Sequence, residues 1–282
     1  IDLHVLKRME DEGMSPSKAA DKRTLIRRVS FDLTGLPPSR KEVRAFVADD
    51  NPVAYDQLVD RLIASDGFGE HMARYWLDLV RFADTNGMHK DFFRNHSAYR
   101  DWVIRAFNEN LGYDDFVRYQ LAGDLFPAAT SDQLAASGFN RLHLIIDRGT
   151  ALPEESFFKN VVDRVTSVGT AFMGMTVHCA SCHDHKYDPL TQQDFYSLFA
   201  FFNNIDAAAE TSGAPKNGLQ PPFAMLGTIQ QKNRIKEIDD QLARIDPEVQ
   251  EAKKRATDEA DPEKKKELMQ EAREVVAKQQ EL

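Results

Sequence analysis

Both cysteines of this 282-residue chain lie in one five-residue stretch, Cys179-Ala180-Ser181-Cys182-His183. Cys-x-x-Cys-His is the attachment signature of a c-type haem. The two thiols of such a site bond to the porphyrin, and the adjoining imidazole binds the iron. We therefore predict one covalent haem c, with Cys179 and Cys182 as its tethers and His183 as the proximal ligand.

Other uses of the same stretch are weighed against haem. A zinc site could draw on Cys179, Cys182 and either His183 or His185, but the usual second Cys or His pair at finger spacing is missing. A redox dithiol of the thioredoxin type belongs in a βαβ pattern, which the sequence does not show. A disulfide across two residues would close too small a loop to stabilise much. An inert or relict motif is the remaining alternative.

The composition favours a globular chain and narrows the class of partner. The formal net charge is −9, and 42% of the residues are hydrophobic. A non-specific nucleic-acid binder needs a basic face, so we expect no nucleic-acid partner. No run of about 18 apolar residues occurs, so we expect no transmembrane segment. Haem c is attached outside the cytoplasm, and the motif therefore predicts an exported protein, periplasmic or at the cell surface.

Helical periodicity and helix-end signals run through most of the chain. Gly35 with prolines beyond it ends a helix, and Ser39 and Glu42 form a capping-box pattern. Pro153 before two glutamates indicates the first turn of a helix that we expect to run to about Met175, and Thr191 is expected to cap a later helix. We predict an all-α fold: a multi-helix globular domain with few or no strands, followed by a helical extension. The expected parts are a haem domain at 1–205, a linker at 206–225 and a charged extension at 226–282.

The extension carries apolar residues at alternating spacings of three and four, the pattern of a heptad seam: Ile235, Ile238, Leu242, Ile245 and Val249. This pattern predicts a helical hairpin or coiled coil, which would serve self-association or pack within the chain. Pro247 is expected to interrupt the pattern and to begin a new helix.

Further haem contacts are predicted from residue type. His89 lies in a polar segment between two helical stretches and is our choice for the distal iron ligand. The alternatives are Met88, His143, Met173 and Met175. Arg141 and Arg148 are candidates for the haem propionates, because a guanidinium matches a carboxylate, although ordinary surface pairs are the default for both. His185 follows His183 too closely to reach the other haem face, so we expect it to support the site without binding iron.

Several separate segments resemble the planctomycete cytochrome-like family over roughly residues 1 to 206: Arg27 to Pro37, Tyr75 to Asp78, Tyr99 to Val103, Gln120 to Asp124, Asp163 to Val165 and Cys179 to Pro189. The resemblance implies a haem-c-binding, exported module whose biochemical activity is not established.

Three functions follow as hypotheses. The first is an electron-transfer cytochrome with an as yet unidentified redox partner protein. The second is a haem- or metal-dependent oxidoreductase or hydrolase that acts on an extracellular substrate such as polysaccharide. The third is a structural module with a zinc or relict site.

Overall fold

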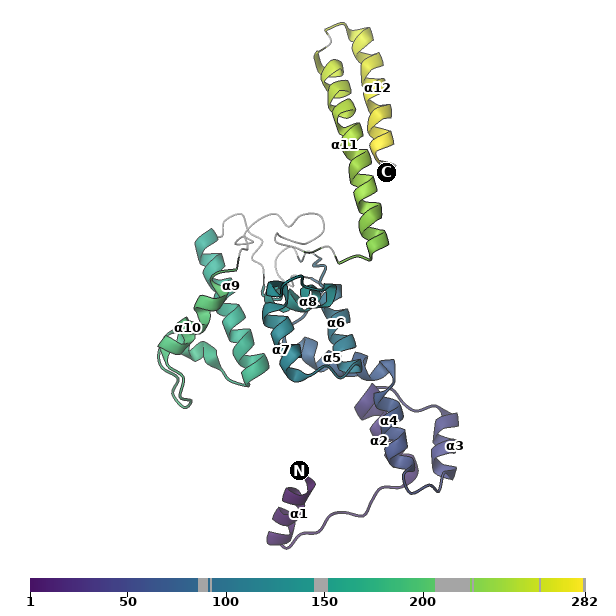
Figure 1. The fold of residues 1–282 in the computed structure, drawn as a ribbon, viewed down its shortest axis with the longest axis vertical. Coiled ribbons are helices and arrows are strands. Elements are labelled where there is room, and N and C mark those ends of the chain that lie inside the picture. Colours follow the sequence, from purple (N-terminus) through teal and green to yellow (C-terminus); the bar gives the residue numbers. More distant parts are fainter. Residues whose placement is uncertain are drawn as a thin grey trace. The chain divides into compact units, whose positions relative to one another are not determined.

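The computed structural model describes residues 1–85, 91, 93–144, 152–205, 224, 226–258 and 260–280 (Figure 1). Every regular element in these ranges is helical, and the single β contact there is an isolated bridge between Thr85 and Phe93. The all-α prediction is confirmed. The chain divides into two compact units, Ile1–Phe223 and Ala224–Leu282. Most of the expected linker at 206–225 lies outside the described residues.

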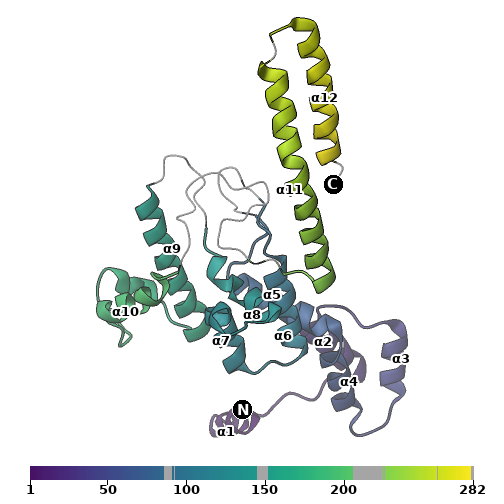
Figure 2. The same ribbon diagram turned by 45° about the horizontal axis from the view of Figure 1, so that its top comes forward.

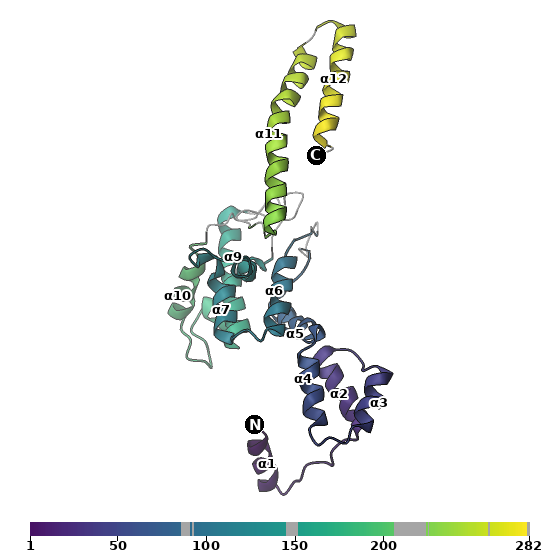
Figure 3. The ribbon, with the colours of Figure 1, turned by 45° about the vertical axis from the view of Figure 1, so that its right-hand side comes forward.

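The first unit opens with four helices: α1 (Asp2–Asp11), α2 (Lys22–Thr34), α3 (Arg40–Ala48) and α4 (Ala54–Ile63). The last three pack together (Figure 3) around a core that includes Ile26, Phe46 and Leu58. Gly35 ends α2 in the left-handed region with φ 68°, which favours glycine. The predicted capping box at the start of α3 is confirmed, since Ser39 and Glu42 each accept the other's backbone N–H.

The middle of the unit contains α5 (Asp66–Leu79), α6 (Ser97–Asn108), α7 (Tyr113–Ala122) and α8 (Ser131–Ala136), with short 3₁₀ turns η1 (Gly123–Leu125) and η2 (Ser137–Arg141) (Figure 2). A buried polar network joins three of these helices. The Trp76 indole N–H lies 3.1 Å from both Tyr99 Oη and Gln120 Oε1, and the Tyr99 hydroxyl donates to Gln120 Oε1 at 2.7 Å. Burial raises the pKa of Tyr99 above its usual range, which keeps the hydroxyl protonated as a donor.

The last part of the unit carries the Cys-x-x-Cys-His motif. Helix α9 (Pro153–Val168) begins with proline at its first position, as predicted, and ends earlier than the expected limit near Met175. A π-helical turn, η3 (Gly169–Met173), follows it and closes at Gly174. The chain then forms a 3₁₀ turn, η4 (Val177–Ser181), and α10 (Gln192–Phe202). Both η4 and α10 pack on α9.

The second unit is a helical hairpin of α11 (Ile229–Asp258) and α12 (Pro262–Gln280), which lie side by side (Figure 1). The prediction that Pro247 begins a new helix is wrong, because α11 continues through it. An internal proline removes a backbone hydrogen bond and crowds the preceding turn. Burial of Val249, Ala252 and Ala256 beyond it, with Ala272 of α12 buried as well, offsets that cost. Among all described residues, no helix has the length and apolar character to cross a membrane.

Candidate functional site

The motif lies on a short turn that exposes both thiols. Val177 and Ala180 are buried, at 1% and 0% exposed, and hold η4 against the rest of the unit. Cys179 and Cys182 are exposed and are free thiols. The sequence therefore places the two reactive side chains on the solvent side of a turn whose other side is anchored in the core.

A close contact between two turns sets the position of η4. A Cβ atom added to Gly169 would lie 2.5 Å from both methyl carbons of Val177. Real Cβ contacts are essentially never that short, so only glycine at 169 lets Val177 pack where it does. The end of α9 and the start of the motif are thus fixed to each other.

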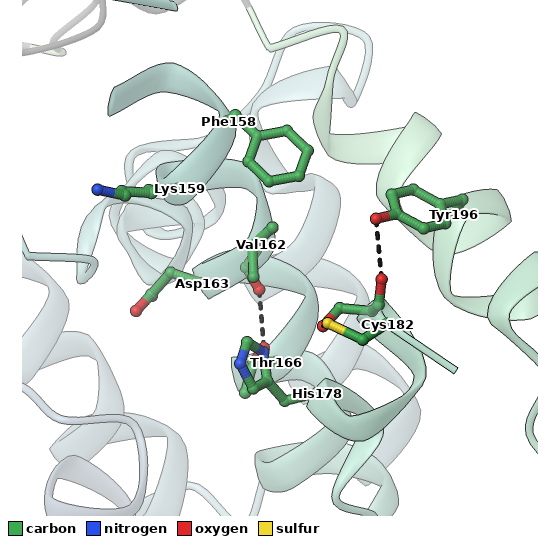
Figure 4. Close-up of a pocket in the computed structure, with 9 residues that line it drawn as sticks. Phe158, Lys159, Val162, Asp163, Thr166, His178, Cys182 and Tyr196 are labelled. Carbon is green, nitrogen blue, oxygen red and sulfur yellow. Dashed lines mark hydrogen bonds between the residues drawn. The ribbon is translucent and has the colours of Figure 1, made fainter. Parts of the chain in front are cut away.

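Helix α10 holds the backbone between the two cysteines. The Tyr196 hydroxyl donates to the Ser181 carbonyl oxygen at 3.0 Å (Figure 4), and Gln192 Nε2 donates to the same oxygen at 3.3 Å. The Asp184 carboxylate accepts the Gln192 backbone N–H at 2.8 Å, at the positive end of α10. The motif is therefore tied to this helix on both sides of Cys182.

The start of α10 is itself well defined. Thr191 and Asp194 form the capping box, which confirms the predicted Thr191 cap. Hydrogen bonds from Thr191 lower the pKa of Asp194, because they favour its charged form. The residues that hold the motif are thus placed by local helix-end chemistry.

The His183 ring has a tautomer set by one hydrogen bond. Its Nδ1 lies 2.8 Å from the backbone carbonyl oxygen of Asp184. A carbonyl oxygen only accepts, so Nδ1 is the donor, and Nε2 carries the lone pair when the ring is neutral. Metal-binding histidines are commonly oriented by such a bond from the other ring nitrogen. Nε2 of the exposed His183 imidazole is therefore the nitrogen left available to a metal.

His185 has a different role. Its Nδ1 accepts backbone N–H groups from Asp188 at 2.9 Å and Tyr187 at 3.3 Å. Asp188 Oδ2 also lies 3.3 Å from this nitrogen. The ring holds the turn that follows the motif.

A pocket of about 530 Å³ adjoins Cys182 (Figure 4). It lies between α9, the motif and α10, and its lining is Phe158, Lys159, Val162, Asp163, Thr166, His178, Ser181, Cys182 and Tyr196. Ligand pockets typically enclose about 300–1,000 Å³ with mostly apolar walls and a few polar groups. The volume and the lining both fit that description.

The motif carries the three groups that a covalent haem needs, but Cys182 lines the pocket, whereas Cys179 and His183 are not part of its lining. Two free thiols are available for thioether bonds, His183 offers Nε2, and apolar side chains line the space beside Cys182. Within the ranges that the structure describes, no three His, Cys, Asp or Glu side chains come together as a metal-binding group.

The other predicted haem contacts are not gathered at this pocket. Arg141 ends η2, its backbone carbonyl accepts a hydrogen bond from Arg94, and it is not part of the pocket lining. His143 is buried at 2% exposed, and its carbonyl accepts from Arg94 at 2.8 Å. Met173 is half exposed on η3. His89, Met88 and Arg148 lie outside the described residues.

The sequence did not distinguish the outward face of α9 from its buried face. Phe158, Val162 and Thr166 follow one another at four-residue spacing and line the pocket. Val161 and Val165 are fully buried on the neighbouring stripe of the helix. The sequence signal that could have revealed the pocket wall was this second apolar stripe, which is displaced by one residue from the stripe that faces the core.

The geometry defines a class: an all-helical domain with a solvent-exposed Cys-x-x-Cys-His segment beside an apolar pocket. Residues 1–207 match PSCyt2, a protein of unknown function (DUF1549), and the chain belongs to this family. The family name is consistent with the resemblance seen in the sequence. No curated protein and no solved structure matches the chain.

Proposed function

We propose that this chain is an exported, c-type cytochrome-like module that binds one covalent haem and transfers electrons. The observation that carries the proposal is the accessibility of the reactive groups in the Cys-x-x-Cys-His motif. Both cysteines are free and exposed, and the adjacent His183 has its Nδ1 proton bound to a backbone carbonyl. The three groups that a haem c needs are thus chemically available in one turn.

Each residue has a defined part in the proposal. Cys179 and Cys182 form the thioether bonds, and His183 presents Nε2 to the iron. When bound, the haem supplies a one-electron redox couple. The Asp184 carbonyl holds the Nδ1 side of the imidazole, which leaves Nε2 for the iron, and Tyr196 and Gln192 hold the peptide between the tethers.

The distal side of the iron is part of the same proposal. We assign it to His89, on the sequence reasoning given above. A strong sixth ligand gives low-spin iron, so His89→Ala should convert a low-spin optical spectrum to a high-spin one. His143→Ala is less informative, because His143 is buried and its loss would disturb the core. An unchanged low-spin spectrum in His89→Ala removes His89 from this role.

The covalent attachment of haem to the two cysteines is tested by exporting the protein in a host with a haem-c maturation system. The full chain should keep haem after denaturing electrophoresis, and its intact mass should rise by that of one haem. Cys179→Ser and Cys182→Ser should each retain at most one thioether bond, and the double variant should retain no covalent haem. Ser181→Ala is the control, since it changes the motif without removing a tether. A wild-type chain that carries no haem contradicts the proposal.

A further inference from the structure

The apolar seam of α11 is covered at one end of the helix and open at the other. Val249, Ala252 and Ala256 lie toward the end of the helix and are buried, with Val249 only 2% exposed. Toward the start of the helix the cover decreases, since Ile238 is half-buried and Ile235 is 39% exposed. A single face of α11 thus changes from core to surface along its length.

The lengths of the two hairpin helices account for this change. α11 has 30 residues and α12 has 19, and α12 folds back beside α11 from the turn that joins them (Figure 2). Both helices rise about 1.5 Å per residue, so α12 ends before it reaches the start of α11. The seam keeps the a and d spacing of a coiled coil where α12 does not reach, with Ile235 at position a and Ile238 at position d.

The helix is well formed where the seam is open. The Thr228 backbone N–H donates to Gln231 Oε1 at 2.8 Å, and the Gln231 backbone N–H donates to Thr228 Oγ1 at 3.2 Å. These reciprocal bonds form a capping box, which defines the first turn of α11. Ile235 and Ile238 therefore lie inside a capped helix, beyond its first turn.

The charges beside the seam match those of a second α11 that runs in the same direction. Arg234 precedes position a and is a g residue, and Asp239 follows position d and is the next e residue. In a parallel coiled coil a g residue faces the e residue five positions further along the other helix. Arg234 of each copy would then face Asp239 of the other, and Glu248 and Lys253 have the same relation.

An antiparallel pair would bring like charges together. In that arrangement e residues face e residues, and Asp239 and Asp246 are both acidic. The contact that Arg234 makes within its own helix is an exposed one, with Nη1 3.2 Å from Glu237 Oε2 and side chains 64% and 63% exposed. Exposed pairs of this kind contribute little, so this contact does not prevent Arg234 from pairing with a second copy.

We propose that the open part of the α11 seam binds the same segment of a second copy of this chain, parallel and in register. Ile235 and Ile238 of both copies form the apolar centre of the contact. The two symmetry-related Arg234–Asp239 pairs set its direction. The inference goes beyond the proposed function and does not depend on haem, because all of these residues lie in the helical hairpin.

The first test is the molar mass of the full chain, measured by sedimentation equilibrium over a range of concentrations. The wild-type mass should rise toward twice the 32.0 kDa of one chain. Ile235→Asn should weaken the association by about tenfold or more, because it removes a buried apolar side chain from each copy. Met269→Asn is the matched control, since Met269 is a 47% exposed apolar residue of α12 outside the α11 seam.

The second test examines the direction of the contact by exchanging charges. Arg234→Glu and Asp239→Lys each place like charges opposite one another, so each variant alone should associate about tenfold more weakly than wild type. An equal mixture of the two variants should recover the wild-type association, because every g–e pair between unlike copies again joins opposite charges. The recovery should be weaker at high salt, which screens these exposed pairs.

Three results would overturn the inference. The first is a wild-type mass that stays at 32.0 kDa up to the limit of solubility. The second is an Ile235→Asn protein that associates as strongly as Met269→Asn. The third is a mixture of the charge variants that associates no better than either variant alone. Where Ile235→Asn loses helical signal in far-ultraviolet circular dichroism, the exposed charge variants decide the question.

Discussion

Arg81 and Asp163, 82 residues apart, form a bidentate salt bridge in which Nη1–Oδ2 and Nη2–Oδ1 are both 2.7 Å. Arg81 also donates to Ser167 Oγ on the same helix. The hydrogen bonding of Arg81 to the Asp163 carboxylate raises the pKa of Arg81. Arg81 has a left-handed backbone with φ 61°, just after α5 ends. The pair thus fastens the helix that forms one wall of the pocket to a strained turn at the end of α5.

Asp163→Asn should destabilise the first unit modestly. Bidentate Arg–carboxylate pairs are among the stronger ion pairs, but both side chains are partly exposed, so we expect a loss of about 1 kcal/mol. A double-mutant cycle with Arg81→Met, followed by urea unfolding, isolates the coupling. Additive losses would show that the two side chains do not stabilise the fold as a pair.

Gly169→Ala should disturb the motif directly. The new Cβ would meet the Val177 methyl groups at 2.5 Å, and overpacking of this kind costs about 1–3 kcal/mol. We expect lower stability by chemical denaturation and less matured protein. The control is Gly67→Ala in α5, whose Cβ would find only an ordinary contact at 3.6 Å. That substitution should be neutral or stabilise by up to about 1 kcal/mol. Equal effects of the two variants would contradict the contact.

Tyr196→Phe removes one of the two side-chain hydrogen bonds to the Ser181 carbonyl. Gln192 remains as a donor, so the expected loss is about 0.5–1.5 kcal/mol in the free energy of unfolding. The same substitution at Tyr187, which is 83% exposed, serves as the comparison and should change little. A Tyr196→Phe protein as stable as wild type would show that this bond does not hold the motif.

Acid should weaken the α2–α4 part of the chain through Glu42. A hydrogen bond from Arg61, followed by those from Ser39, lowers the pKa of Glu42 from 4.5 to about 2. A carboxyl group with a depressed folded pKa stabilises the fold above its unfolded pKa and loses that contribution as the pH falls toward the folded value. Stability should therefore decline between about pH 4.5 and 2.

Glu42→Gln tests this dependence. The variant should be less stable than wild type at neutral pH, by about 1 kcal/mol or less because both partners of the Glu42–Arg61 pair are partly exposed, and its unfolding should depend less on pH in the acid window. Glu70→Gln, at an exposed position of α5, is the control. An acid dependence of Glu42→Gln as steep as that of wild type would assign the effect to other groups.

Local signals in the sequence predicted much of the helical structure. The Ser39–Glu42 box, the Thr191 cap and the proline at the start of α9 depend on residues within one turn, so the pattern itself contains the interaction. The early end of α9 was not predicted, because it accompanies a contact between Gly169 and Val177 across a turn. The prediction that Pro247 begins a new helix was wrong for the same reason, since packing with α12 outweighs the local cost of proline.

At the candidate site as well, residues close together in the sequence were predicted, and contacts that depend on the tertiary fold were not. Cys179, Cys182 and His183 were identified from their spacing alone. The pocket was not, because Phe158, Cys182 and Tyr196 come from three elements that only the tertiary fold brings together. The hydrogen bond that sets the His183 tautomer was also beyond sequence reasoning, since it depends on the backbone angle at Asp184.

The central claim is that Cys179 and Cys182 carry a covalent haem. The most direct measurement is the pyridine haemochrome spectrum of the full chain after export with a maturation system. Two thioether bonds saturate both vinyl groups, so the account predicts an α-band at the position characteristic of haem c, with one haem per chain. A preparation that folds, as judged by far-ultraviolet circular dichroism, yet gives no haemochrome and binds zinc or retains two free thiols would contradict it.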